Sequence, residues 1–251
     1  MPQLLLGVDV GGSSVKAGAV DVSTGQQVGG TVSAPTPADS TPQNVAAVIA
    51  ALAARLPEAT GPVGVTYPGV VQQGIVRSAA NINHAWLGVN GAAVTCEVLG
   101  RPVVFLNDAD AAGVAEMRWG AGRGHSGTAI MLTFGTGIGS AIFVGGKLFP
   151  NTEFGHMELD GMEAEAFCSA RVRTVEELDF PQWTARVNHF LARMQALFWP
   201  DLFILGGAVS ERFAEFAPLL KVEAEVRAAQ FGNHAGIIGA ALAAAESAAG
   251  A

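Results

Sequence analysis

Two short segments combine glycine with hydroxyl-bearing residues in a pattern that suits the binding of a phosphate. Residues 7–16 read GVDVGGSSVK, and residues 132–139 read LTFGTGIG. Glycine permits positive φ angles, so that backbone N–H groups can point at one anion. The second segment fits neither a Walker loop, which needs a following lysine, nor a dinucleotide fingerprint, which needs a following helix. β-Branched and aromatic residues follow it instead, and we predict a strand, a glycine turn and a second strand.

This strand–turn–strand pattern occurs twice, half a chain apart. In the first copy, Asp9 interrupts the apolar strand and Lys16 comes just after the turn. A repeated hairpin of this kind predicts two related lobes that close on one phosphate chain. The alternative is coincidence between two small tight turns. We prefer duplication because each hairpin begins a segment that continues through strands and a helix.

A further group of polar residues follows a predicted buried strand, Val103–Leu106. Asn107, Asp108 and Asp110 stand where that strand ends and a helix begins. Ligands of open α/β sheets bind at the carboxyl ends of the strands. Helix capping is the other ordinary use of such residues, and we assign it to Asp110. We expect Asp108 to take a proton from a substrate hydroxyl.

Glu153, His156 and Glu158 lie close together in the sequence, after a turn at Pro150-Asn151. Helical spacing would bring the first two together, but the glycine between them favours a loop. Three interpretations fit the group: a metal site, a solvated charged face, or a clamp for a polyol. A closed zinc site would need further Cys or His ligands nearby, and charged residues are commonly just solvated. Carboxylates with an imidazole suit a sugar, because each buried hydroxyl needs a hydrogen-bond partner.

The apolar pattern of the remaining chain predicts an α/β protein with two lobes. Short apolar runs predict buried strands, and apolar residues at helical spacing predict helices. The predicted strands include 64–67 and 202–205, and the predicted helices begin at Ser40-Thr41-Pro42, at Asp108 and near residue 182, with an Ala-rich helix from residue 236 closing the chain. Residues 21–40 are polar and rich in turn formers, and no element is predicted there.

Composition excludes several classes of protein. The chain has 251 residues, 50% of them hydrophobic and 14% charged, which excludes disorder and allows two modest cores. No apolar run reaches the length of a membrane span and no signal peptide is recognisable, so we expect a cytoplasmic protein without a membrane partner. Cys96 and Cys168 occur in unrelated contexts, which argues against disulfides and a Cys-rich zinc site. The net charge of −8 disfavours nucleic acid as a partner.

Taken together, these motifs resemble the ROK (repressor, ORF, kinase) family of sugar kinases, and most of all its polyphosphate glucokinase and glucomannokinase branch. The matching segments run in order along nearly the whole chain: GVDVGGSSVK (7–16), LNDADAAG (106–113), LTFGTGIGSAIFVGGKL (132–148), EFGHMELDG (153–161), LFILGG (202–207) and NHAGIIGAA (233–241). The resemblance implies the two-lobed, actin-like ATPase fold of the hexokinase and Hsp70 type, with the active site in the interlobe cleft. We expect a first lobe over 1–107, a second over 108–232 and a closing helix over 233–251.

The resemblance also implies roles for individual residues. Asp108 matches the general base, and Asp9 matches the carboxylate that organises Mg²⁺ through water. The sugar ligands are matched by Asn81, Asn107, Glu153, His156 and Glu158; the phosphate contacts by Gly11, Gly12, Ser13, Ser14, Lys16, Thr133, Gly135, Thr136 and Gly137; and the nucleotide-side glycines by Gly206 and Gly207.

Three departures from the family pattern are visible. The Cys-rich zinc motif that follows the Gly-His pair in many members is replaced by MELDGMEAEAFCSARVR, with Cys168 alone, so we expect no zinc. The helix-turn-helix of the family's repressors is not seen ahead of the first hairpin. Ala208 stands where a third glycine is usual.

The expected activity is transfer of a phosphoryl group to the 6-hydroxyl of glucose, with mannose left open as a second substrate. We expect inorganic polyphosphate as donor, with ATP also used, and a homodimer by resemblance. A basic track formed by Lys16, Arg118, Arg123 and Lys147 would suit a polyanion, although these residues are otherwise ordinary surface charges. The alternatives are a strictly ATP-dependent ROK glucokinase and, as a different class, a sugar-sensing regulator without catalysis.

Overall fold

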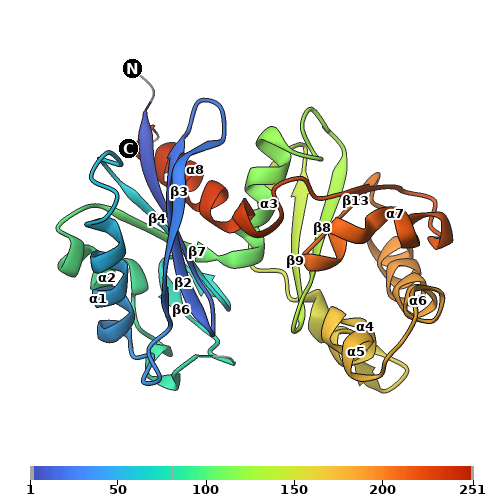
Figure 1. Ribbon diagram of the computed structural model, residues 1–251. Helices are drawn as coiled ribbons and strands as arrows, with labels where there is room; N and C mark the ends of the chain where they lie inside the picture. Colours follow the sequence, from blue (N-terminus) through green and yellow to red (C-terminus); the bar gives the residue numbers. More distant parts are fainter. Residues whose placement is uncertain (1–2, 81, 250–251) are drawn as a thin grey trace. The chain divides into compact units, whose positions relative to one another are not determined.

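The computed structural model describes residues 3–80 and 82–249, which form two compact units (Figure 1). The first unit combines the chain up to Ala115 with the residues from His234 onward, and the second is the continuous stretch 116–233. No helix in the described part of the chain is long and apolar enough to cross a membrane.

The first unit is built on a five-stranded sheet of order β3-β2-β1-β4-β7. Its strands are β1 (Leu4–Val10), β2 (Ser14–Asp21), β3 (Gln26–Pro35), β4 (Val63–Tyr67) and β7 (Val103–Asn107), and its helices are α1 (Pro42–Ala53), α2 (Gly91–Leu99), the first part of α3 (Asp108–Trp119) and α8 (Ala235–Ala249). A small hairpin of β5 (Val71–Gln72) and β6 (Ile75–Val76) and a 3₁₀ turn, η1 (His84–Trp86), follow β4.

Helices cover both faces of this first sheet. Leu6 and Val8 of β1 share a buried cluster with Val45 and Ile49 of α1. The opposite face of the sheet is covered by α8, which passes directly over paired glycines of neighbouring strands, Gly7 in β1 and Gly64 in β4. A Cβ atom at either glycine would overlap a backbone carbonyl of α8, at Ile237 and Ala240 respectively. The two glycines therefore allow the helix backbone to lie directly on the sheet.

The second unit repeats this plan with a sheet of order β10-β9-β8-β13-β14. Its strands are β8 (Thr128–Phe134), β9 (Ile138–Val144), β10 (Lys147–Phe149), β13 (Leu202–Gly206) and β14 (Glu225–Ala228), and its helices are α4 (Ala164–Cys168), α5 (Ala170–Val175), α6 (Phe180–Phe198) and α7 (Phe213–Phe216). Shorter pieces are the strands β11 (Glu158–Leu159) and β12 (Met162–Glu163) and the 3₁₀ turns η2 (Phe154–His156), η3 (Ala208–Arg212), η4 (Ala217–Leu219) and η5 (Gly232–His234).

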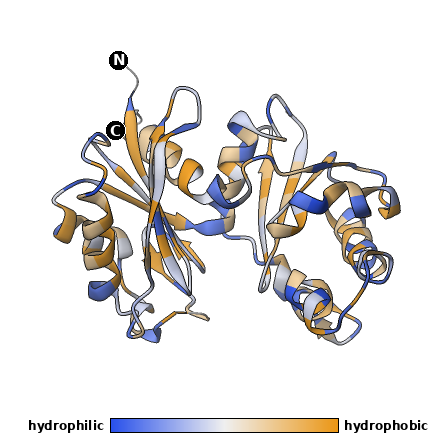
Figure 2. Cartoon of the chain, viewed as in Figure 1, coloured by the Kyte–Doolittle hydropathy of each residue, from blue (hydrophilic) through white to orange (hydrophobic). Residues whose placement is uncertain are grey.

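The core of the second unit lies between its sheet and α6. Trp183 of α6 is fully buried and meets the ring of Phe134 edge-on, at 5.5 Å between centroids. Figure 2 shows that apolar residues follow the strands of both sheets, as expected for strands covered by helices. The buried side chains of α6, Trp183 and Phe190 among them, recur at helical spacing and therefore form one core face.

The two sheets share one topology. In each, three antiparallel strands are followed by two strands parallel to the first: β1, β4 and β7 in one sheet, and β8, β13 and β14 in the other. Both predicted hairpins are present, as β1–β2 and β8–β9. The prediction of two related α/β lobes is thus confirmed.

The sequence prediction was wrong about residues 21–40, which contain the ten-residue strand β3. This strand lies at the edge of its sheet, and most of its side chains are exposed. An edge strand that buries little has no apolar run to reveal it. The predicted helix start was right, because Thr41 caps α1 and Pro42 is its first residue. The apolar spacing of the helix continues in the sequence to Leu56, but α1 ends at Ala53 and Leu56 lies beyond it.

Candidate functional site

The first glycine turn connects β1 to β2 and is closed by a hydrogen bond from Gly11 N to Ser14 O, at 3.0 Å. Thr36 braces it from the end of β3, because its hydroxyl donates to Gly11 O at 2.6 Å and its N–H donates to Ser13 O at 3.1 Å. Gly12 and Ser13 at the tip are exposed. The turn therefore presents its backbone to solvent from a braced position, as an anion-binding turn must.

Asp9 lies in β1 directly before this turn, and Lys16 is its register partner on β2. The hydroxyl of Thr66, in the neighbouring strand β4, donates to Asp9 Oδ1 at 2.7 Å and accepts from Val10 N at 3.2 Å. Thr66 is completely buried. The carboxylate is thus oriented by a fixed side chain of the next strand, a contact that the sequence did not reveal.

Asp108 is the first residue of α3 and follows β7 directly. Its Oδ1 accepts from Ala109 N at 2.8 Å, and the side chain is half-buried. Asn107, which is 5% exposed, accepts from Asp110 N at 2.9 Å and donates to Gly69 O at 3.1 Å. Asn107 rather than Asp110 therefore caps the helix, because a capping side chain binds the N–H group three residues further on.

Asp9 and Asp108 belong to one edge of the first sheet. β1, β4 and β7 are parallel neighbours, and Asp9 and Asp108 stand at or just beyond the carboxyl ends of the two outer strands of this set. This edge is where open α/β sheets bind ligands. Asn81, a further predicted residue, lies outside the described residues.

The second glycine turn connects β8 to β9, with Gly135 N donating to Gly137 O at 3.0 Å. Thr133 of β8 pairs with Gly206 at the end of β13. Gly207 follows with a φ of 83°, and a Cβ atom there would overlap the carbonyl of Phe134. The structure thus brings the predicted nucleotide-side glycines against the base of the predicted phosphate turn.

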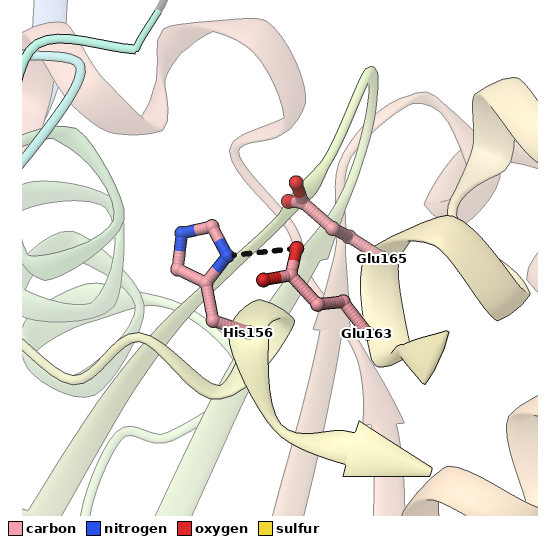
Figure 3. Close-up of side chains that lie close together, drawn as sticks. All are labelled: His156, Glu163 and Glu165. Atoms are coloured by element: carbon pink, nitrogen blue, oxygen red, sulfur yellow. Dashed lines mark hydrogen bonds and ion pairs between the residues drawn. The ribbon is translucent and has the colours of Figure 1, made fainter. Parts of the chain in front are cut away.

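Glu153 and His156 also meet, through the single 3₁₀ turn η2 rather than the predicted loop. His156 Nε2 lies 3.9 Å from Glu153 Oε2. On its other side, Nδ1 lies 3.2 Å from Glu163 Oε2 (Figure 3). Glu165 of α4 is the third carboxylate near this imidazole, and its Oε2 accepts from Ile138 N, just after the glycine turn, at 3.3 Å. Glu158 is exposed on β11 and pairs in register with Glu163.

The close carboxylates change the protonation of this cluster. Burial opposes the charge on His156, but the hydrogen bond to Glu163 and the charges of Glu165 and Glu153 outweigh it, so the pKa of His156 lies above its ordinary value. Burial raises the pKa of Glu153, while the charge of His156 lowers it and that of Glu165 raises it. The imidazole is therefore biased toward its protonated form, in which both ring nitrogens donate.

His156, Glu163 and Glu165 are close enough to hold a cation, since one atom of each lies within 4.8 Å of the others. Of these three, the sequence analysis had singled out only His156. No local sequence pattern indicates that the two glutamates approach His156, because β12, which carries Glu163, is only two residues long. Their approach depends on the β11–β12 hairpin and on α4, which fold the chain back onto η2 (Figure 3).

Of the residues proposed for a basic track, Lys147 does not lie at the second turn. It begins β10 and pairs with Val144, at the end of β9 opposite the turn. The seven residues of β9 separate the two ends, which at about 3.3 Å per residue is roughly 20 Å. Arg118 is exposed in the last turn of α3, and Arg123 is exposed beyond the end of that helix. Lys16 lies in the first unit.

Duplicated sheets with one glycine turn each, and a carboxylate at the end of a parallel strand, define a phosphotransferase of the actin-like ATPase class. Residues 5–178 match the sequence pattern of the ROK family, and the chain belongs to that family.

Individual relatives are similar over nearly the whole chain. The polyphosphate glucokinase of Mycobacterium tuberculosis (strain CDC 1551 / Oshkosh) is 46% identical over 238 residues, which cover 94% of this chain and 89% of the relative. The crystal structure of the inorganic polyphosphate/ATP-glucomannokinase from Arthrobacter sp. strain KM is similar with a TM-score of 0.92 and 44% identity, covering 97% of this chain and 99% of that one. A ROK family glucokinase from Streptomyces griseus, solved with glucose and AMPPNP, has a TM-score of 0.82 and 27% identity, with coverages of 97% and 99%.

Proposed function

We propose that the protein is a hexose kinase that transfers the terminal phosphoryl group of inorganic polyphosphate to the 6-hydroxyl of glucose, and that it also uses ATP. The observation that carries the proposal is Asp108, a half-buried carboxylate at the start of α3 in a fold with two glycine turns. The choice of donor is supported by relatives named for polyphosphate at 46% and 44% identity. Mannose is proposed as a second acceptor, since one of these relatives is a glucomannokinase.

In the proposed reaction, the 6-hydroxyl oxygen bonds to the terminal phosphorus as the bond from phosphorus to the bridging donor oxygen breaks. Asp108 receives the hydroxyl proton. The hydrogen bond from Ala109 N to Oδ1 restricts rotation of this carboxylate, which favours one orientation toward the attacking oxygen. Positioning of this kind supplies much of the rate in phosphoryl transfer, because the protein performs little covalent chemistry itself.

The sugar is proposed to bind Asn81, Asn107, Glu153, His156 and Glu158. Contacts within the second unit support Glu153 and His156 most, since these side chains meet in one cluster of donors and acceptors. One N–H of the Asn107 amide already binds Gly69, so its second N–H is the group proposed for sugar. The exposure of Glu158 makes it the weakest member of this set.

The donor phosphates are proposed to bind the two glycine turns: Gly11, Gly12, Ser13, Ser14 and Lys16 from the first, Thr133, Gly135, Thr136 and Gly137 from the second, with Gly206 and Gly207 on the nucleotide side. Mg²⁺ fits the Asp9 side of the first turn, because a magnesium ion is commonly held by one or two carboxylates together with substrate phosphates. Asp9 would hold the ion through water, and the bound ion would neutralise phosphate charge. The Thr66 hydroxyl keeps the carboxylate oriented for this purpose.

Further parts of the proposal concern the assembly. Two functional lobes over 1–107 and 108–232, with a closing helix over 233–251, are supported by the presence of two compact units. A homodimer is proposed, supported by exposed apolar residues such as Trp199 (70% exposed) and Phe149 (63% exposed) on the second unit. We propose a cytoplasmic location, in keeping with the free thiols of Cys96 and Cys168, and no zinc in the folded protein.

The test is a coupled assay for glucose 6-phosphate with polyphosphate and with ATP, at matched Mg²⁺. We expect turnover with both donors, and we expect Asp108→Asn to lower kcat by about 10²- to 10⁴-fold while glucose still binds. Glu97→Gln, an exposed change on α2, serves as the control. Activity with ATP alone would leave a strictly ATP-dependent glucokinase. Absence of turnover with either donor, with glucose binding retained, would favour the sugar-sensing regulator.

A further inference from the structure

A groove of about 290 Å³ borders the second glycine turn on the side of α4 and α5. Its lining includes Thr136 at the tip of the turn and Glu165 in α4. It also includes Ser169, Arg171, Val175 and Glu176, which run from the N-cap of α5 to the residue just after its end. Apart from Thr136, none of these residues has a role in the function proposed above. The groove is therefore a space continuous with the phosphate turn for which no ligand has yet been assigned.

The backbone of α5 is fixed to the turn. Arg171 N donates to Gly135 O at 3.0 Å, so the backbone of Arg171 is hydrogen-bonded directly to the first glycine of the turn. Ser169, which is 1% exposed, caps α5 by accepting from Val172 N at 3.3 Å. These contacts hold Arg171 at the junction between the turn and the groove.

The groove is lined by two carboxylates, Glu165 and Glu176, and by one cation, Arg171. The carboxylate of Glu176 is paired with Arg186 Nη2 at 2.6 Å, which offsets its charge. Glu165 directs Oε2 toward the N–H of Ile138. The side chain of Arg171 is exposed, and within residues 3–80 and 82–249 no carboxylate lies within salt-bridge distance of it. Arg171 is thus a cation at the edge of a phosphate turn with its charge available to a ligand.

We propose that this groove binds the phosphate units of the polyphosphate chain that lie beyond the transferred group, with Arg171 as their main cation. The inference rests on the proposed function. A polyphosphate that places its terminal unit at the glycine turn must leave the turn along some path, and it carries about one charge on every unit. A guanidinium binds phosphate oxygens through two parallel N–H groups, and the Thr136 hydroxyl is a further donor on the same path.

If Arg171 binds the phosphate units beyond the transferred group, its loss should affect polyphosphate and ATP differently as phosphoryl donors. ATP has only three phosphates, and its nucleoside is proposed to lie toward Gly206 and Gly207, whereas polyphosphate continues past the turn. Arg171 then contributes to the binding of polyphosphate and little to that of ATP. A different occupant would reverse this pattern, because the apolar wall formed by Val172 and Val175 also suits a nucleobase. In that case the loss of Arg171 would weaken ATP more than polyphosphate.

The experiment compares Arg171→Gln with Arg193→Gln, a matched loss of charge at an exposed position of α6 outside the groove lining. Steady-state kinetics are measured with long-chain polyphosphate and with ATP at constant Mg²⁺ and ionic strength, after thermal unfolding has established that both variants are folded. For Arg171→Gln we expect KM for polyphosphate to rise about tenfold, which is about 1.4 kcal/mol. The KM values for ATP and glucose should stay within about twofold of the wild type, and Arg171→Lys should recover part of the loss.

The possible results distinguish failure of the groove assignment from failure of the proposed kinase activity with polyphosphate. If the wild-type protein uses polyphosphate but Arg171→Gln behaves like Arg193→Gln, the groove assignment is wrong and the kinase proposal stands. Equal losses with both donors, or a larger loss with ATP, also overturn the assignment, because Arg171 would then serve the shared phosphates or the base. If the wild-type protein does not use polyphosphate at all, the proposed donor fails, and the groove assignment fails with it.

Discussion

Thr66 takes no direct part in the proposed reaction, but its hydroxyl fixes the orientation of Asp9, which is proposed to hold Mg²⁺ through water. Its hydroxyl donates to Asp9 and accepts from the next N–H group of β1, so the carboxylate and the start of the glycine turn share one buried anchor. Side chains that orient a metal-associated carboxylate commonly affect activity by one to two orders of magnitude. Thr66 therefore offers a test of the role proposed for Asp9 that leaves the carboxylate itself in place.

We predict that Thr66→Val lowers kcat about tenfold and raises the Mg²⁺ concentration needed for half-maximal rate, because Asp9 loses its fixed orientation. The free energy of unfolding should fall by about 1 kcal/mol, since Val10 N–H loses its acceptor. The matched control is Thr95→Val in α2, at a completely buried hydroxyl with no hydrogen-bond partner in the described part of the chain. A variant at Thr66 that matched this control in both kinetics and stability would contradict the prediction.

The protonation of His156 is a second property that can be measured at one residue. Its pKa is raised by the hydrogen bond to Glu163 and by the nearby carboxylates, against an opposing effect of burial. A raised folded-state pKa means that the contribution to stability is fully present below the ordinary histidine pKa of about 6.5 and is lost as the pH rises through the folded-state value. The side chains of His156 and Glu163 are 52% and 55% exposed, so this contribution is small.

We predict that NMR titration of the imidazole gives a pKa above that of histidine in a flexible peptide, and that Glu163→Gln lowers it. A pKa of His156 that did not respond to Glu163→Gln would show that the 3.2 Å contact does not persist in solution.

At the scale of single residues, the sequence analysis predicted the functional residues that lie inside a local motif. It missed residues that contact such a motif from a distant part of the chain. Asp9 and Asp108 were visible because a strand, a turn and a helix start surround them. Thr66 lies 57 positions from Asp9, and its contact exists only because β1 and β4 are neighbours in the sheet. The capping role was assigned to Asp110 instead of Asn107 because composition alone does not say which residue of a polar run ends the strand.

At the scale of the elements, the backbone of α8 lies directly against the first sheet. Two glycines in register, Gly7 and Gly64, leave room for the helix backbone itself rather than for interlocking side chains. The Ala-rich sequence of the helix is consistent with this, because small side chains permit close packing. The contact also brings the start of α8 to the strand that carries Asp9.

We predict that Gly64→Ala lowers the free energy of unfolding by about 2–3 kcal/mol, because the new methyl group overlaps the carbonyl of Ala240 and the helix must move. Gly30→Ala is the matched control in the same sheet: Gly30 lies in β3, where an added Cβ atom meets nothing within 4 Å. Urea denaturation of the two variants measures the difference. Equal midpoints would mean that α8 does not lie against the sheet as described.

Element prediction succeeded where burial is strong and failed where it is weak. The hairpins and the helix α6 were predicted because their apolar residues recur at the spacing of the element that they form. β3 was missed because its pairing with the backbone of β2, rather than burial of its own side chains, holds it in the sheet. η2 was expected as a loop because one 3₁₀ turn is too short to show a period.

At the scale of the whole molecule, the chain crosses between its two units at residues 115–116 and again at 233–234. Glu116, fully buried beside the first crossing, accepts from Gln230 N at 2.7 Å and from Phe231 N at 2.9 Å, just before the second crossing. It also accepts from Ala121 N at 2.8 Å. One carboxylate thus ties together the two segments through which the units are linked.

The first unit is assembled from two separate stretches of the chain, up to residue 115 and from residue 234 onward, and this affects the order in which the units can fold during synthesis. β1, β4 and β7 are synthesised early, but the helix that covers one face of their sheet, α8, is synthesised only after the whole second unit. The second unit, continuous from 116 to 233, is complete before that helix appears. A chain truncated after residue 233 should therefore contain a protease-resistant second unit and a protease-sensitive first one. Until α8 is released, the apolar face of the first sheet is open to chaperones and to other nascent chains, so the order of synthesis makes the first-made half of this protein the last to be protected.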